Sequence, residues 1–134
     1  MRKVGIIGMG FAGKAHFEAM QTSNQFGVTA LCDIDLQKLD KYPSNILSFP
    51  SAIDIIKHSE VDVVIIATPH HTHLALVTLA RQYNKKVLLE KPLAHTLHDA
   101  QSIIDIDKKW PHSISVNMTH RFRDPILLAK RLIS

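Results

Sequence analysis

The sequence predicts an α/β fold in which a doubly wound parallel sheet of about six strands carries helices on both faces. Short apolar runs rich in Val and Ile alternate with stretches of helical period, which is the pattern of strand–helix units. The apolar runs are hydrophobic almost throughout, as expected for strands that are covered on both faces. The chain of 134 residues is 46% hydrophobic, enough for one domain with a substantial core.

Each expected strand is an apolar segment bounded by polar or turn-forming residues. The strongest of these segments, residues 61–67, is apolar at nearly every position and is therefore expected at the centre of the sheet. The expected strands, in chain order, are residues 3–7, 28–32, 46–49, 61–67, 87–89 and 114–117.

The segments between these strands show helical spacing or helix-capping residues. Ser51 is an expected N-cap, and Thr96 with Asp99 three residues later resembles a capping box. Asp124 followed by Pro125 is typical of a helix start. The expected helices are residues 11–20, 36–41, 52–58, 72–83, a helix from 96 towards 110, and a last helix from 124 onward.

The charge of the chain does not indicate a nucleic-acid partner. The formal net charge of +4 arises from 16 basic and 12 acidic side chains. Most of the excess lies in residues 111–134, which hold four basic side chains and one acidic one. Because no stacking aromatic side chains accompany this short segment, we interpret it as a solvated helix face and expect no nucleic acid.

Composition also favours a cytoplasmic protein without a membrane partner. The longest uninterrupted apolar run, residues 63–67, is far shorter than the roughly 20 residues that a membrane-spanning helix needs. The apolar stretch near the N-terminus is too short for a signal peptide. Cys32 has no second cysteine to pair with, so an internal disulfide is excluded.

A glycine-rich loop follows the first expected strand and has the pattern G-x-G-x-x-G. Gly8 permits a tight turn, Gly10 leaves space for a pyrophosphate, and Gly13 allows close packing of helix on strand. Phe11 and Ala12 begin the helix, whose amino end favours an anion. These five residues are predicted to bind the pyrophosphate of a dinucleotide. The alternative is a flexible structural turn.

An acidic residue at the end of the second expected strand completes this pattern. Asp33 lies 20 residues beyond Gly13, where a carboxylate can accept hydrogen bonds from the adenosine ribose. The 2′-phosphate of NADP would bring about two negative charges next to it. Residues 34 and 35 provide no cation to offset them. The sequence therefore predicts NAD as the cofactor in preference to NADP.

The residues after the fourth expected strand should also line the cofactor, because ligands of such sheets lie beyond the carboxyl ends of the strands. Thr68 and Pro69 stand there, followed by His70, His71 and His73. Their spacing does not fit a helical zinc pair, and no carboxylate or cysteine accompanies them. We therefore predict no metal site and expect these histidines to cap a helix and face the cofactor.

The fifth expected strand is followed by Glu90, Lys91 and Pro92. A lysine at this position faces the crevice in which a nicotinamide would lie. Its ammonium group can bind a substrate oxygen and stabilise negative charge that develops there. The alternative, a solvated lysine in a loop, stays open from these three residues alone.

Together, these motifs and their order resemble the Gfo/Idh/MocA family, which are NAD(P)-dependent dehydrogenases of sugars and cyclitols related to glucose–fructose oxidoreductase and inositol dehydrogenase. The Glu-Lys-Pro element is the specific marker, because the glycine loop is shared with every Rossmann protein. The residues that carry the resemblance are Gly8–Gly13, Cys32-Asp33, Ala67-Thr68-Pro69 with His73, and Glu90-Lys91-Pro92-Leu93.

The resemblance implies roles for the candidate site residues. Lys91 matches the family's catalytic lysine, which contacts the substrate hydroxyl near the nicotinamide. Pro92 shapes the same turn, often after a cis peptide bond, and Glu90 belongs with it to the cofactor-binding segment. The loop that lines the cofactor is matched by Thr68, Pro69 and His73, and the adenosine ribose acceptor by Asp33.

The resemblance also implies a division of the chain. Residues 1–120 are expected to form the nucleotide-binding domain, and residues 121–134 a linker helix towards a C-terminal α/β domain. In relatives that second domain provides the aspartate and histidine partners of catalysis and the usual homo-oligomer interface. Without it, apolar side chains of the last helix should stay uncovered.

The expected function is thus that of the nucleotide-binding half of an NAD-dependent oxidoreductase, which transfers a hydride between nicotinamide and a sugar or polyol hydroxyl. The chain alone should bind NAD with little or no turnover. One alternative is a stand-alone dinucleotide-binding redox sensor or non-catalytic partner protein. Another is a reductase of the dihydrodipicolinate or homoserine type, against which the Glu-Lys-Pro element argues.

Overall fold

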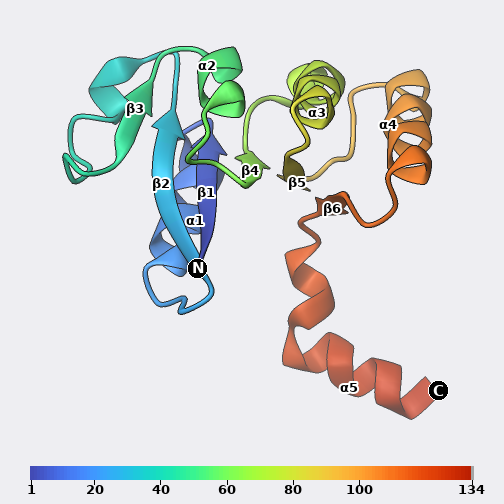
Figure 1. The fold of residues 1–134 in the computed structure, drawn as a ribbon. Helices are drawn as coiled ribbons and strands as arrows, with labels where there is room; N and C mark the ends of the chain where they lie inside the picture. Colours follow the sequence, from blue (N-terminus) through green and yellow to red (C-terminus); the bar gives the residue numbers. More distant parts are fainter. Residues whose placement is uncertain (134) are drawn as a thin grey trace.

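The computed structural model describes residues 1–133, so Ser134 at the end of the expected linker helix lies outside them. Six parallel strands form one sheet in the order β3-β2-β1-β4-β5-β6 (Figure 1). The strand order reverses between β1 and β4, which defines the switch point of a doubly wound sheet. The predicted fold class is confirmed. The strands are β1 (Arg2–Ile7), β2 (Phe26–Cys32), β3 (Leu47–Phe49), β4 (Val63–Ile66), β5 (Lys86–Leu89) and β6 (Ile114–Val116).

The helices follow the expected order with local differences. The helix expected over residues 36–41 is a single 3-10 turn, and the one expected from residue 72 is preceded by another. A third 3-10 turn, after β6, was not expected. The α-helices are α1 (Phe11–Met20), α2 (Ala52–Lys57), α3 (His73–Gln82), α4 (Leu97–Lys109) and α5 (Asp124–Ile133), and the 3-10 turns are η1 (Leu36–Lys38), η2 (His70–Thr72) and η3 (Thr119–Phe122).

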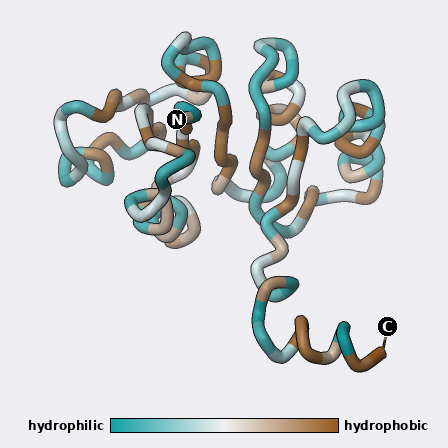
Figure 2. Tube along the Cα trace, turned by 60° about the horizontal axis from the view of Figure 1, so that its bottom comes forward, coloured by the Kyte–Doolittle hydropathy of each residue, from teal (hydrophilic) through white to brown (hydrophobic). Residues whose placement is uncertain are grey.

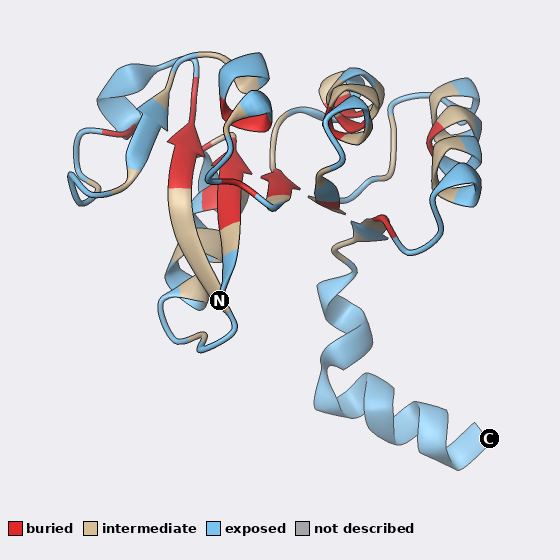
Figure 3. Ribbon diagram, viewed as in Figure 1, coloured by how far each residue is buried: buried red, intermediate tan, exposed pale blue. Residues whose placement is uncertain are grey.

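Two apolar clusters hold the helices against the sheet. One cluster joins side chains of α2, α3 and α4, among them Ile55, Val77 and Ile103, to one face of the strands. The other places Phe17 of α1 and Leu39 after η1 against the opposite face. Figure 3 shows buried residues concentrated in the central strands and on the inner sides of these helices. Coverage of both faces explains why the strand sequences are apolar at successive positions.

Of the two expected helix caps at Thr96 and Ser51, one forms a side-chain hydrogen bond and the other does not. Thr96 caps α4 as predicted, because its hydroxyl accepts the backbone N–H of Asp99 at 3.1 Å. Ser51 occupies the N-cap position of α2, but its side chain makes no capping hydrogen bond. Its backbone carbonyl instead accepts the N–H groups of Asp54 and Ile55 at 3.2 and 3.4 Å.

The last helix stands apart from the sheet. Figures 1 and 2 show α5 projecting from the body of the molecule after η3, with hydrophobic positions along its length. Leu132 is 77% exposed, and Ile126 and Leu127 are also exposed, as expected for a helix without cover. No helix within residues 1–133 is long and apolar enough to cross a membrane.

Candidate cofactor site

The glycine loop lies between β1 and α1, and at two of its glycines a side chain would collide with neighbouring backbone atoms. Gly8 has a φ of +91°, and its N–H donates to the Cys32 carbonyl at 2.8 Å. A Cβ at Gly8 would lie 2.7 Å from the Ala67 carbonyl oxygen, and one at Gly13 would lie 1.9 Å from the Gly8 carbonyl oxygen. The loop therefore turns tightly beside β4 and the helix packs directly on the turn, as predicted.

The middle glycine has a different surrounding, which fits the predicted pyrophosphate. A Cβ at Gly10 would meet no atom within 4 Å, so the backbone faces open space. Within residues 1–133 no side chain caps the amino end of α1, and no acidic side chain lies in its first turn. The N–H groups of this turn are thus available to an anion. Phe11, the first residue of the helix, is 94% exposed, and Ala12 is half-buried.

Asp33 follows β2 and is held towards the glycine loop. Its side chain is only 6% exposed, and it accepts the N–H groups of Met9 at 2.8 Å and Asp35 at 3.0 Å. Burial alone would raise the pKa of this carboxyl group, but the hydrogen bonds from Asp35, Met9 and Lys38 hold the pKa below its ordinary value. The group is therefore an ionised acceptor at neutral pH.

Lys38 is a site residue that sequence reasoning missed. Its ammonium nitrogen lies 3.1 Å from Oδ1 of Asp33. Only residues 34 and 35 were considered as sources of a cation, but the 3-10 turn η1 brings the chain back so that Lys38 faces the carboxylate. The signal in the sequence was a lysine five residues after Asp33, inside a segment that was expected to be helical.

These residues line a cavity of about 520 Å³ at the carboxyl ends of β1, β2 and β4. Five of the predicted cofactor residues meet there, namely Gly8, Gly10, Asp33, Thr68 and Pro69. The cavity is also lined by residues that sequence reasoning did not single out for the cofactor, including Ile34, Lys38, Pro50, Cys32 and Leu76.

The thiol of Cys32 stays neutral in this cavity. Its burial is the main reason, and the nearby carboxylates of Asp33 and Asp54 add to it; together they raise the pKa of the thiol to about 12.

His73 is not exposed to this cavity. Its side chain is almost fully buried, and its two ring nitrogens lie 3.1 Å from the Thr68 carbonyl oxygen and 3.2 Å from that of Leu93. It thus joins the loop after β4 to the loop after β5. The ring of His70 packs at 4.9 Å from that of His95. Among residues 1–133, no group of three or more side chains of His, Cys, Asp or Glu is arranged to hold a metal ion.

Glu90, Lys91 and Pro92 form the turn after β5. The Lys91–Pro92 peptide bond is cis, and the side chain of Lys91 is exposed. Glu90 accepts hydrogen bonds from Asn117 and is paired with His16, two residues that sequence reasoning did not single out. Burial would raise the pKa of Glu90, but the hydrogen bonds from Asn117 and His16 hold it below its ordinary value.

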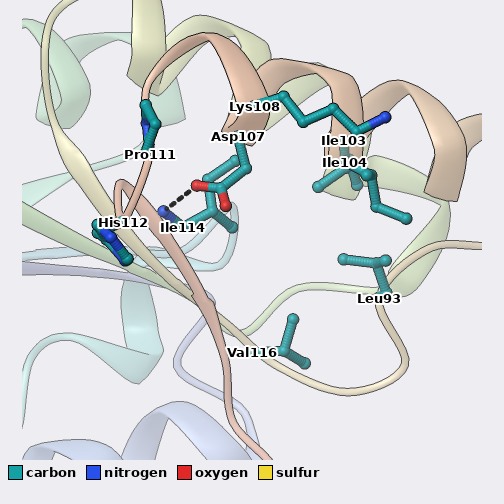
Figure 4. Close-up of a pocket in the computed structure, with 9 residues that line it drawn as sticks. All are labelled: Leu93, Ile103, Ile104, Asp107, Lys108, Pro111, His112, Ile114 and Val116. Atoms are coloured by element: carbon teal, nitrogen blue, oxygen red, sulfur yellow. Dashed lines mark hydrogen bonds between the residues drawn. The ribbon is translucent and has the colours of Figure 1, made fainter.

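A second cavity, of about 320 Å³, lies between α4 and β6 and contains none of the predicted site residues. Figure 4 shows mainly apolar side chains around it, with the carboxylate of Asp107 turned towards the start of β6. Asp107 accepts the N–H groups of Ser113 and Ile114 at 3.2 and 3.1 Å. Its hydrogen bonds connect the end of α4 to β6, which is a structural role.

Comparison with known proteins identifies the family of this chain. Residues 2–118 match the oxidoreductase family with an NAD-binding Rossmann fold, Gfo/Idh/MocA. An inositol 2-dehydrogenase of Salmonella typhimurium is 35% identical in an alignment that covers 98% of this chain and 41% of that protein. The myo-inositol dehydrogenase of Lactobacillus casei, solved with NAD(H) and myo-inositol, has a TM-score of 0.91 at 27% identity, covering 99% of this chain and 41% of that one.

The sheet order and the glycine loop define an NAD-binding Rossmann domain, with NAD as its cofactor. The chain belongs to the Gfo/Idh/MocA oxidoreductase family, and residues 2–118 match its NAD-binding Rossmann fold. It spans about two fifths of the length of the relatives it matches.

Proposed function

We propose that this chain is the nucleotide-binding half of a dehydrogenase that oxidises a sugar or polyol hydroxyl. The observation that carries the proposal is the position of the Glu90–Pro92 turn at the carboxyl end of β5, on the same edge of the sheet as the glycine loop and Asp33. In such sheets, ligands bind along this edge. The inositol substrates named for the two relatives support a polyol as the substrate class.

Different residues along that edge bind different parts of the cofactor and the substrate. The backbone N–H groups at the start of α1 bind the pyrophosphate, and Asp33 accepts hydrogen bonds from the adenosine ribose. When bound, NAD supplies the hydride acceptor. Lys91 orients the substrate hydroxyl and stabilises the negative charge that develops on its oxygen. The group that accepts the hydroxyl proton belongs to a further domain, as the resemblance implies.

The domain division follows from the same proposal. Residues 1–120 form the nucleotide-binding domain, and residues 121–134 connect it to the substrate domain. The exposed apolar side chains of α5 support this division, because an amphipathic helix of this kind is stable when another surface covers it. The isolated chain binds NAD with little or no turnover, and the complete enzyme is a homo-oligomer.

A chimera tests the proposal. Residues 1–134 replace the matching segment of the Salmonella typhimurium inositol 2-dehydrogenase, and NAD reduction with inositol is followed by absorbance. We expect the chimera to be active, its Lys91→Met variant to lose about 100-fold or more in kcat, and the isolated chain to show almost no turnover. An active isolated chain, or a Lys91→Met chimera as fast as its parent, would contradict the proposal. Lys109→Met is the matched control, because Lys109 lies at the end of α4.

A further inference from the structure

Three polar side chains meet behind the turn that carries Lys91, and they come from three separate elements. His16 lies on α1, Glu90 directly follows β5, and Asn117 directly follows β6. Oε1 of Glu90 lies 2.7 Å from Nε2 of His16 and 2.6 Å from the amide nitrogen of Asn117. The side chains of His16 and Glu90 are each only 13% exposed. We call these three residues the Glu90 cluster.

The protonation of Glu90 determines how the cluster is connected. The lowered pKa keeps this carboxylate ionised at neutral pH, so it can only accept hydrogen bonds. His16 therefore donates through Nε2–H, and Asn117 donates through its amide. The second oxygen, Oε2, accepts the backbone N–H of Lys91 at 3.2 Å. One oxygen of Glu90 thus faces the two other elements and the other faces the Lys91 backbone.

This arrangement connects the two halves of the candidate cofactor site. The amino end of α1, which fits the pyrophosphate, lies on the same helix as His16. The turn that carries Lys91 lies where the nicotinamide half is expected. Hydrogen bonds to a charged group are stronger than those between neutral groups. The Glu90 cluster therefore restrains this turn more firmly than a loop with solvated side chains would be restrained.

We propose that Glu90 is a positioning residue, which through His16 and Asn117 holds the Lys91 turn in place for the nicotinamide half of the cofactor. The proposal rests on the proposed function for the location of Lys91 beside the nicotinamide. Without the cluster, the turn would have to be ordered when the ligand binds, and that ordering reduces affinity. The loss of affinity should therefore be larger for a ligand that carries the nicotinamide than for one that lacks it.

Two ligands that differ only in the nicotinamide test this expectation. ADP-ribose contains the adenosine, the pyrophosphate and the second ribose, whereas NAD⁺ adds the nicotinamide. We expect Glu90→Gln and Asn117→Ala to weaken NAD⁺ binding to the chain by about fivefold or more, and ADP-ribose binding by less than about twofold, in calorimetric titrations. His16→Gln retains an N–H donor and should stay closer to the parent chain than His16→Ala.

Asp107→Asn is the matched control for general destabilisation. Asp107 is also a hydrogen-bonded carboxylate that connects a helix to β6, but it lies at the other end of that strand. Its variant should lower the unfolding temperature and leave the ratio of the two dissociation constants unchanged. Equal weakening of NAD⁺ and ADP-ribose by Glu90→Gln, or no weakening of NAD⁺, would overturn the positioning role.

A measurement without ligand keeps the two proposals separable. Amide hydrogen exchange at Lys91 should accelerate about tenfold or more in Glu90→Gln, because the substitution weakens the acceptor of the Lys91 N–H. If Glu90→Gln does not fold, Asn117→Ala serves as the test variant, and the same acceleration is expected there. Unchanged exchange in the folded variant would overturn the role of Glu90. If the parent chain bound neither ligand, the proposed function would fail, while the exchange rates would still decide whether Glu90 restrains the turn.

Discussion

The ammonium group of Lys38 lies 3.1 Å from Oδ1 of Asp33, at the edge of the cofactor cavity. The two oxygens of Asp33 also accept the N–H groups of Asp35 and Met9. An ionised carboxylate offers about four acceptor positions, so three are already used. Because the Lys38 side chain is 43% exposed, it can turn away and leave a second position for the ribose. This pair makes cofactor selectivity directly testable.

Asp33→Ser should weaken NAD binding and reduce the difference in affinity between NAD and NADP. The substitution removes the ribose acceptor and the charge that repels a 2′-phosphate, and it leaves Lys38 unpaired beside that phosphate. We expect about tenfold weaker NAD binding and tighter NADP binding in titrations with both cofactors. Unchanged affinities for both would refute the assignment of Asp33.

Lys38→Met should increase the preference for NAD. The ammonium group offsets part of the repulsion between Asp33 and a 2′-phosphate, and methionine retains a chain of similar length without the charge. We expect NADP binding to weaken by about threefold or more at low salt, with NAD changed by less than about twofold. Lys109→Met, far from the cavity on α4, is the control. Equal losses for the two cofactors would contradict this role of Lys38.

Gly10→Ala and Gly13→Ala should separate binding from stability. The added Cβ at Gly10 meets no protein atom, so the free energy of unfolding should not change, while NAD binding weakens because the methyl group enters the pyrophosphate space. The Cβ at Gly13 would overlap the Gly8 carbonyl oxygen, which should lower the free energy of unfolding by about 2–3 kcal/mol. Urea denaturation and NAD titration measure the two effects. A destabilised Gly10→Ala with normal NAD affinity would be the opposite of this expectation.

Stability should fall in acid through Asp33 and Glu90. Both carboxyl groups have pKa values in the folded protein below their ordinary values of 3.8 and 4.5. A depressed pKa in the folded state contributes stability above the ordinary pKa, and this contribution is lost as the pH falls through the folded-state pKa. The unfolding temperature should therefore decrease below about pH 4.5. The unfolding temperature of Glu90→Gln should decrease less steeply with falling pH than that of the parent chain. An identical slope for the two proteins would contradict a contribution of Glu90 to this pH dependence.

Much of the fold could be predicted because it depends on local pattern. The apolar runs identify all six strands, and Thr96 with Asp99 marks the start of α4 as found. The 3-10 turn after β6 was missed, and the one after β2 was expected as a longer helix, because one turn of helix has no amphipathic period to detect. For Ser51, residue type predicted the N-cap position but not which of its oxygens would accept the hydrogen bonds.

The candidate site divides in the same way. Gly8 and Gly13 could be located because a contiguous motif fixes their positions between a strand and a helix, and Asp33 because it follows the next strand. His16 and Asn117 stand 101 residues apart in sequence and meet only because α1 and the end of β6 both adjoin the end of β5. No local signal marks such a contact, so the Glu90 cluster required the three-dimensional structure.

Titration of the chain with NAD⁺ tests the central claim most directly. We expect saturable binding of one NAD⁺ per chain, tighter than that of NADP⁺, and we expect Gly10→Ala to weaken this binding without changing the stability of the protein. A chain that is folded by circular dichroism and binds neither NAD⁺ nor NADH would contradict the assignment of an NAD-binding domain.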